Sequence, residues 1–199
     1  MKRFYLVRHA QSELNEKGVF QGRLDSDLTP LGFVQARLVA GFLKDKGIKR
    51  IVSSPQRRAY KTALIIGDVL SLEVDLDDRL REMSFGDLEG KSFWDLMERE
   101  REMIVSWLKD PVRFPLPTQE PVEAFEKRVS SFVEDMVSWE EDTVAVIAHG
   151  GTLHAIVCLT TGLDLSRLWR IHMDNASITL LEFDGSFRIA YLNRKCHLI

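Results

Sequence analysis

The chain has 199 residues, the length of one domain, and its hydrophobic fraction of 45% supports a substantial core. Its formal net charge of -3 creates no field that would attract a polyanion, so we expect no nucleic-acid partner. No apolar stretch approaches the roughly 18 residues that a membrane-spanning helix needs, so we expect no membrane contact and a cytoplasmic protein.

Residues 4–7 (FYLV) form a short apolar run, which predicts a buried strand that ends at Arg8. Farther along, Thr29 can cap a helix with Pro30 at its first position, and Gly47 supplies the end. The apolar positions at helical spacing here are Leu31, Val34, Leu38 and Phe42. The first part of the chain therefore predicts a strand followed by an amphipathic helix.

The same alternation continues along the chain. Ile51 and Val52 predict a second short strand, and the helix after it carries apolar residues at Ala59, Ala63, Ile66 and Leu70. A later amphipathic helix is marked by Val122, Phe125, Val129, Phe132 and Met136. Residues 144–148 predict another buried strand, and a helical pattern resumes at Leu153.

The end of the chain indicates two further strands, at residues 178–183 and 187–191, joined by the hairpin-type dipeptide Asp184-Gly185. Alternating strands and helices predict a mainly parallel sheet, and the closing hairpin adds antiparallel pairing at one edge. We therefore expect an α/β fold with three layers, α/β/α, in a single domain over residues 1–199.

Residues 84–121 depart from this alternation, because aromatic residues in a charged helical stretch precede a proline-rich run. We interpret this segment as a helical cap that covers a cleft; a surface helix with an ordinary connecting loop is the alternative. The aromatic candidates for a pocket lining are Phe85, Trp94, Trp107 and Phe114. Aromatic residues at helical spacing are also typical of a core.

Two histidines follow directly after predicted strands, where open α/β sheets bind their ligands. His9 comes after Arg8, and His149 precedes Gly150, whose small size lets backbone N–H groups approach an anion. Arg57 and Arg58 lie in the first turn of the helix after the second strand, where cations oppose the helix dipole unless an anion is bound, and we expect one of the pair to face solvent. These residues predict a phosphate site.

The same residues resemble motifs of the phosphoglycerate mutase-like histidine phosphatases, in the family's order. Residues 6–15 (LVRHAQSELN) resemble its phosphohistidine motif, with Ala10 where glycine is usual. Residues 53–63, 80–90 and 149–151 resemble its second arginine motif, its acidic motif and its second histidine. The resemblance implies a phosphatase that works without a metal or other cofactor on a small phosphorylated metabolite.

Carried over residue by residue, the resemblance implies that His9 is the nucleophile and Glu82 the general acid and base. It implies phosphoryl contacts from Arg8, Arg58 and His149, with further contacts from Asn15 and Gln21. Outside the resemblance, Glu82 would be interpreted as a surface carboxylate paired with a neighbouring arginine.

Departures from the family favour one activity over another. The mutases have Arg-His-Tyr-Gly after the acidic residue, whereas residues 83–86 read Met-Ser-Phe-Gly, which favours a phosphatase. A phosphoglycerate mutase and a catalytically silent phosphate-binding regulatory module are the alternatives. Where the family often has Gly-Gly-Glu-Ser, residues 118–121 read Thr-Gln-Glu-Pro and keep only the acid.

Residues 165–169, 174–177 and 196–198 resemble the metal-independent phosphoserine phosphatases. That resemblance implies that His197 binds the substrate carboxylate and that the chain forms a homodimer; a terminal histidine without a role is the alternative. Phe85 stands where those enzymes have a histidine, which favours a more apolar substrate. Phosphoserine, α-ribazole phosphate and sugar phosphates are the substrate candidates.

The remaining histidines and cysteines indicate no metal site. His154 and His172 form no ligand pair at helical spacing, and we interpret both as structural. Cys158 and Cys196 fit no metal-ligand spacing, and we expect two reduced thiols.

Overall fold

A computed structural model describes residues 1–198 and contains one six-stranded sheet with the strand order β3-β2-β4-β1-β5-β6. The strands are β1 (Lys2–Arg8), β2 (Arg50–Ser53), β3 (Val74–Leu76), β4 (Thr143–Ala148), β5 (Ile178–Phe183) and β6 (Phe187–Arg194). The first four in the sheet, β3, β2, β4 and β1, are mutually parallel, while β5 runs antiparallel to both β1 and β6. The predicted α/β class and sheet are confirmed.

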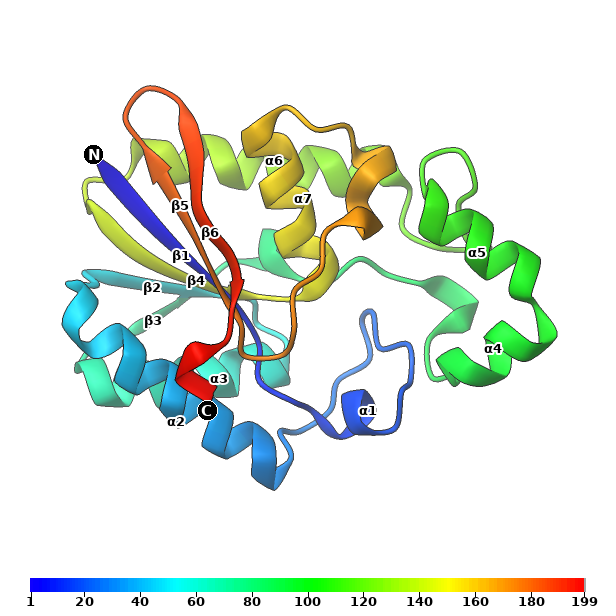
Figure 1. Cartoon of the computed structure of the whole chain (residues 1–199), viewed down its shortest axis with the longest axis horizontal. Helices are drawn as coiled ribbons and strands as arrows, with labels where there is room; N and C mark the ends of the chain where they lie inside the picture. Colours follow the sequence, from blue (N-terminus) through cyan, green and yellow to red (C-terminus); the bar gives the residue numbers. More distant parts are fainter. Residues whose placement is uncertain (199) are drawn as a thin grey trace.

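Helices cover both faces of this sheet (Figure 1). They are α1 (Glu13–Glu16), α2 (Pro30–Leu43), α3 (Arg57–Leu70), α4 (Phe93–Arg99), α5 (Arg101–Lys109), α6 (Val122–Ser138) and α7 (Gly150–Thr161). Short 3-10 segments occupy Lys44–Lys46, Asp78–Leu80, Gly86–Leu88, Leu165–Arg170 and Cys196–Leu198. None of the helices at residues 1–198 is both long and apolar enough to cross a membrane.

Side-chain alternation along β1 divides the core in two. Phe4 and Leu6 join the cluster under α6 and α7, whereas Tyr5 and Val7 join the cluster under α2 and α3. The central strand β4 is buried at every position, as expected for a parallel strand with helices on both faces.

Helix α2 begins as predicted, with the Thr29 side chain accepting a hydrogen bond from the Gly32 amide and Pro30 at the first position. The apolar stripe expected from the sequence is largely wrong, because Leu31, Val34 and Leu38 are exposed. The buried positions are Gly32, Ala36, Val39, Ala40 and Leu43. Glycine and alanine at several of these positions let the helix approach its neighbours closely. The face that contains them is therefore the one that packs against the core.

The segment at residues 84–121 contains α4 and α5, which lie to one side of the sheet (Figure 1). Hydrogen bonds hold it both within itself and to the loop before α2: Trp107 Nε1 donates to Gln119 Oε1 at 3.1 Å, and the amides of Gly90 and Phe93 donate to the carbonyl oxygens of Phe20 and Gly18 at 2.8 and 2.9 Å. The interpretation of this segment as a cap stays a prediction.

Candidate active site

Parallel pairing aligns the carboxyl ends of three strands. Arg8 at the end of β1 pairs with Ala148 of β4, and Ser53 of β2 pairs with Ile147. The residues that follow these ends therefore meet at one edge of the sheet, and the rings of His9 and His149 lie 5.1 Å apart between centroids.

The surroundings of His9 fix its tautomer. Nδ1 lies 2.8 Å from the carbonyl oxygen of Ala10, which can only accept, so Nδ1 carries the proton and Nε2 carries the lone pair. Burial, followed by the positive charges of Arg58 and Arg8, holds the pKa of His9 well below its usual 6.5. His9 is thus a neutral imidazole with a lone pair on Nε2.

Arg58 reaches this lone pair from the first turn of α3, with Nε 3.3 Å from His9 Nε2. Its other nitrogens donate to the carbonyl oxygens of Leu24 at 2.8 Å and Gly22 at 3.0 Å, which fixes the guanidinium plane. The side chain is 1% exposed, and this burial lowers its pKa to about 10. The neighbouring Arg57 is exposed.

Two further groups complete the polar end of the site. Arg8 donates from Nη1 to the Met173 carbonyl, and its Nε is buried without a partner among residues 1–198. His149 Nε2 lies 2.8 Å from Ser54 Oγ, and its Nδ1 is likewise buried and unpartnered in that range. Burial is the main cause that keeps the pKa of His149 well below 6.5.

The cationic end has no carboxylate counterion within the described part of the chain, because none of the ion pairs found there includes Arg8 or Arg58. A buried Arg58 beside a partly buried Arg8, neither of them in an ion pair, is costly unless an anion binds between them. The arrangement is therefore suited to a phosphoryl group.

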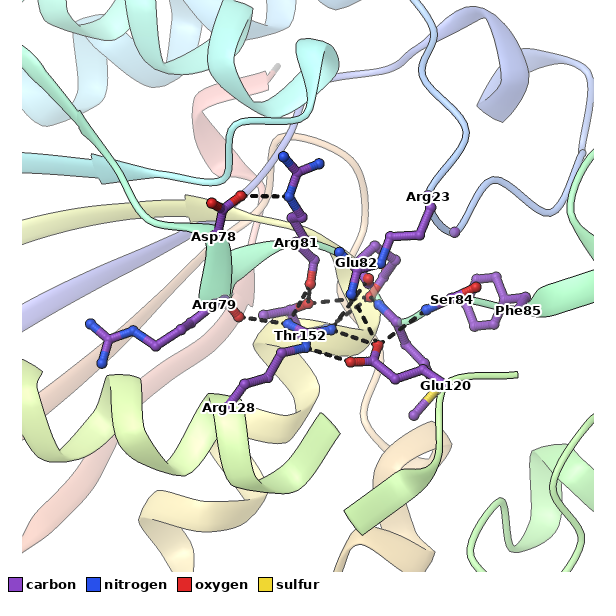
Figure 2. Close-up of polar contacts among 12 residues, drawn as sticks. Arg23, Asp78, Arg79, Arg81, Glu82, Ser84, Phe85, Glu120, Arg128 and Thr152 are labelled. Atoms are coloured by element: carbon purple, nitrogen blue, oxygen red, sulfur yellow. Dashed lines mark hydrogen bonds and ion pairs between the residues drawn. The ribbon is translucent and has the colours of Figure 1, made fainter. Parts of the chain in front are cut away.

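Glu82 is held at the first turn of α7 by backbone donors (Figure 2). Its Oε2 accepts from the Gly151 amide at 3.0 Å, and its Oε1 accepts from the amides of Thr152 at 3.1 Å and Met83 at 2.9 Å. A Cβ at position 151 would lie 2.7 Å from Glu82 Oε1, so this close approach requires glycine. Glu82 is buried, contrary to the alternative of a surface carboxylate.

Arg128 of α6 fastens the segment that carries Glu82 (Figure 2). Its Nη1 donates to the carbonyl oxygens of Arg79 at 2.6 Å and Arg81 at 2.7 Å, while Nε and Nη2 pair with the Glu120 carboxylate at 2.7 and 2.9 Å. Glu120 also accepts from the Ser84 amide at 3.3 Å. Sequence reasoning missed Arg128 because most of its acceptors are backbone carbonyls, which carry no side-chain motif.

Arg8, His9, Arg58 and Glu82 line one cavity of about 400 Å³, a size typical of small-molecule sites. The cavity brings together the predicted residues Arg8, His9, Asn15, Gln21, Arg58, Glu82 and Gly150. Asn15 Oδ1 accepts from Ser12 and Asn175, and Gln21 Oε1 accepts from Ser12 and Ser26, which leaves both amide nitrogens free to donate.

Three residues predicted for the site do not line this cavity: His149, His197 and Phe114. The ring of His149 lies beside that of His9, at 5.1 Å between centroids. His197 packs on Phe42 with a centroid separation of 5.4 Å, and its Nε2 lies 2.9 Å from the Ala176 carbonyl oxygen. Phe114 lies on a different surface hollow, whereas Phe85, Trp94 and Trp107 do line the cavity. The tail histidine is therefore not positioned to bind a substrate carboxylate in this structure.

Other predictions concern the cysteines and metal ligands. Cys158 and Cys196 are both free thiols, as expected. Within residues 1–198, no three histidine, cysteine or acidic side chains form a cluster suited to a metal ion. His172 is exposed and lies 3.2 Å from Asp174, whereas His154 lines the cavity, together with Trp169, which the sequence did not single out.

The chain is similar to known proteins in both sequence and fold. The family model described as the histidine phosphatase superfamily (branch 1) matches residues 4–194 of this chain. The Hydrogenobacter thermophilus protein named "Putative phosphoserine phosphatase 2" is 61% identical over 198 residues, which are 99% of this chain and 98% of that protein. "Phosphoserine phosphatase 1" of the same organism is 35% identical and is covered to 95%, by 100% of this chain. A mycobacterial glucosyl-3-phosphoglycerate phosphatase solved with VO3 is 29% identical, with a TM-score of 0.91 over 98% of this chain and 100% of that one.

Proposed function

Because this chain belongs to branch 1 of the histidine phosphatase superfamily and is a phosphatase that works without a metal, we propose that it hydrolyses phosphate monoesters through a phosphohistidine on His9. The observation that carries this proposal is the pairing at His9: Nδ1 is bound to the Ala10 carbonyl at 2.8 Å, and Nε2 lies 3.3 Å from Arg58 Nε. A neutral imidazole whose Nε2 lone pair accepts a hydrogen bond from the Arg58 cation can exchange that bond for attack on a bound phosphoryl group.

In the first step, Nε2 of His9 attacks phosphorus as the bond to the ester oxygen breaks. Arg8, Arg58 and His149 stabilise the charge on the phosphoryl oxygens, and fixed donors of this kind supply most of the barrier reduction in such sites. The carboxyl group of Glu82 gives its proton to the departing alkoxide, which leaves as the alcohol.

In the second step, a water molecule attacks the phosphorus of the phosphohistidine. Glu82, now a carboxylate, takes a proton from this water, while the P–N bond breaks and its electron pair returns to Nε2. The products are inorganic phosphate, neutral His9 and protonated Glu82, so the site is ready for another cycle.

The substrate is a small phosphorylated metabolite, with phosphoserine, α-ribazole phosphate and sugar phosphates as candidates. The relatives named as phosphoserine phosphatases support the first of these. The placement of His197 outside the cavity removes the tail contact on which a phosphoserine preference was expected to rest.

The test is hydrolysis of p-nitrophenyl phosphate in the presence of a chelator, together with chemical quenching to trap protein-bound phosphate. We expect turnover by the wild type and a loss of more than about 1,000-fold in His9→Ala, as is usual when a covalent nucleophile is removed. His172→Ala, at an exposed ring outside the cavity, is the matched control and should remain active.

Three results would contradict the proposal. A requirement for added metal would exclude a metal-free mechanism, and phosphate binding without any trapped phosphohistidine would indicate a silent module. Isomerisation of 3-phosphoglycerate that depends on a bisphosphate primer would instead identify a mutase.

A further inference from the structure

The part of the cavity away from the cationic end is walled by aromatic rings. They are Phe20, Phe85, Phe93, Trp94, Trp107 and Trp169. The rings contact one another: the centroid of Trp107 lies 4.6 Å from that of Trp169, 5.6 Å from Phe85 and 5.9 Å from Phe20. A continuous wall of this kind binds an apolar or aromatic group by excluding water from it.

Three charged side chains line the cavity. Among the described residues, Arg8, Arg58 and Glu82 are the cavity-lining side chains of the arginine, lysine, aspartate and glutamate types. Glu82 lies close to Trp169 of the aromatic wall, but both of its oxygens already accept from backbone amides. The two arginines belong to the phosphate end, so an ammonium or a second carboxylate in the aromatic part meets no free countercharge, and burying either one unpaired is costly.

One polar side chain interrupts this wall. His154 lies on α7, one turn after Gly150, and is 6% exposed, with neither ring nitrogen bonded to any group of residues 1–198. Its ring packs edge-on against Trp169 at 5.8 Å, and Trp169 Nε1 is also buried without a partner in that range. Leaving a buried polar group unpaired is costly, so a histidine that served only as core would be expected to have a partner.

Burial lowers the pKa of His154 to about 3, and the charge of Arg8 acts in the same direction. The ring is consequently neutral at working pH, with one N–H donor and one acceptor nitrogen. A neutral imidazole suits a hydroxyl group, which can both donate and accept, better than a carboxylate.

We propose that His154 and the aromatic wall form a specificity subsite for the alcohol part of the substrate, which selects an aromatic or extended apolar body bearing a hydroxyl group and disfavours a zwitterionic amino acid. This proposal rests on the phosphatase chemistry at His9 and names the class of alcohol that it releases. Phosphoserine is accordingly a poor substrate, whatever the similarity of the chain to proteins named for it.

The experiment compares primary-alcohol esters, because their leaving groups are closely matched in reactivity. The probes are 2-phenylethyl phosphate, its 2-, 3- and 4-hydroxyphenyl analogues, and phosphoserine, each measured as kcat/KM. We expect 2-phenylethyl phosphate to exceed phosphoserine by at least about 10-fold and one hydroxyphenyl isomer to exceed the parent by about 5-fold or more, as one additional hydrogen bond provides.

Two variants assign the hydroxyl preference to His154. His154→Phe keeps the ring against Trp169 and should erase the preference while retaining activity on 2-phenylethyl phosphate. His154→Gln keeps one donor and one acceptor and should restore part of the preference. His172→Phe, at an exposed ring, is the control and should behave as the wild type.

Phosphohistidine trapping separates the two proposals. If phosphohistidine forms but phosphoserine is the preferred ester, or if His154→Phe keeps the hydroxyl preference, the subsite proposal is overturned and the phosphatase chemistry stands. If no ester yields phosphohistidine, the proposed function itself fails. If His154→Phe does not fold, the result for His154→Gln decides: a hydroxyl preference that is reduced while activity on 2-phenylethyl phosphate is retained supports the subsite, and an unchanged preference or an equal loss of activity on all esters opposes it.

Discussion

Burial lowers the pKa of three histidines, two that line the cavity and one that packs beside it. His9, His149 and His154 all have pKa values below the usual 6.5, chiefly because their rings are removed from water. In His9 and His149 the adjacent arginines add to this effect, and the resulting neutral state serves nucleophilic attack and hydrogen bonding. The same burial links the site to the stability of the fold.

The sign of that linkage predicts acid sensitivity. Below about pH 6.5 the unfolded chain protonates these imidazoles while the folded chain does not, so the unfolded state binds more protons and the free energy of unfolding falls with pH. Each histidine contributes about 1.4 kcal/mol per pH unit until its folded-state pKa is reached. For His154 this window runs from 6.5 down to about 3.

Urea unfolding of the wild type and of His154→Phe between pH 7 and pH 4 provides the measurement. We expect the stability of the variant to fall less steeply below pH 6.5, by about one proton, and the two slopes to agree above it. His172→Phe should keep the wild-type slope. Equal slopes for the wild type and His154→Phe below pH 6.5 would show that His154 is not held neutral.

At the level of elements, helix α6 controls the position of Glu82 although it contributes no side chain to the cavity wall described above. Arg128 pairs with Glu120 and donates to the carbonyl oxygens of Arg79 and Arg81, so the segment before Glu82 and the loop at Glu120 both depend on one guanidinium. Both partners of the ion pair are largely buried, with side-chain exposures of 16% and 13%.

Arg128→Lys should therefore disturb catalysis from a distance. A lysine keeps the charge but cannot reproduce the planar fork, so the Glu82 segment loses its carbonyl contacts. We expect kcat for p-nitrophenyl phosphate to fall at least about 10-fold with KM within about 3-fold, and burst kinetics should place the loss in the proton-transfer steps. Stability should fall by about 3 kcal/mol, within the usual range for a broken buried pair.

Asp135→Asn supplies the control, because Asp135 pairs with Arg79 at a largely exposed position. A pair of this kind contributes about 0–1 kcal/mol, and its loss should leave kcat unchanged. If Arg128→Lys changes KM and kcat in equal proportion, or neither of them, Arg128 does not position Glu82.

The elements differ in how well the sequence predicted them. Helix α6 was located by its apolar positions because a single stripe is apolar, and all five predicted positions are buried. Helix α2 carries two apolar stripes, and periodicity alone chose the larger side chains rather than the small ones that pack. Strand β3 has only three residues and α1 only four, too few for either periodicity to register.

At the scale of the molecule, the phosphate end of the site was predictable because parallel topology dictates it. Strand ends of β1, β2 and β4 meet at one edge whatever the loops do, so His9, Arg58 and His149 converge. The alcohol end was not predictable, because His154 and Trp169 become polar cavity groups only through packing. Sequence pattern cannot distinguish a buried histidine with a partner from one without.

The convergence of three strand ends also predicts a response of the whole fold to phosphate. An anion that binds only the folded chain stabilises it by about 2.7 kcal/mol at a concentration of 100 times Kd. For a chain of this length each kcal/mol raises Tm by about 2–4 °C, so saturating inorganic phosphate should raise Tm by roughly 5–11 °C. Differential scanning fluorimetry measures this shift, with sodium chloride of equal ionic strength as the reference. For each variant, Tm with phosphate is compared with Tm of the same variant in sodium chloride.

Arg58→Met should abolish most of the shift, because Arg58 is a buried cation of the site, whereas Arg57→Met, at the exposed neighbouring position, should retain it. A shift of equal size in both variants would mean that phosphate binds elsewhere, and the anion site assigned to the three strand ends would have to be abandoned.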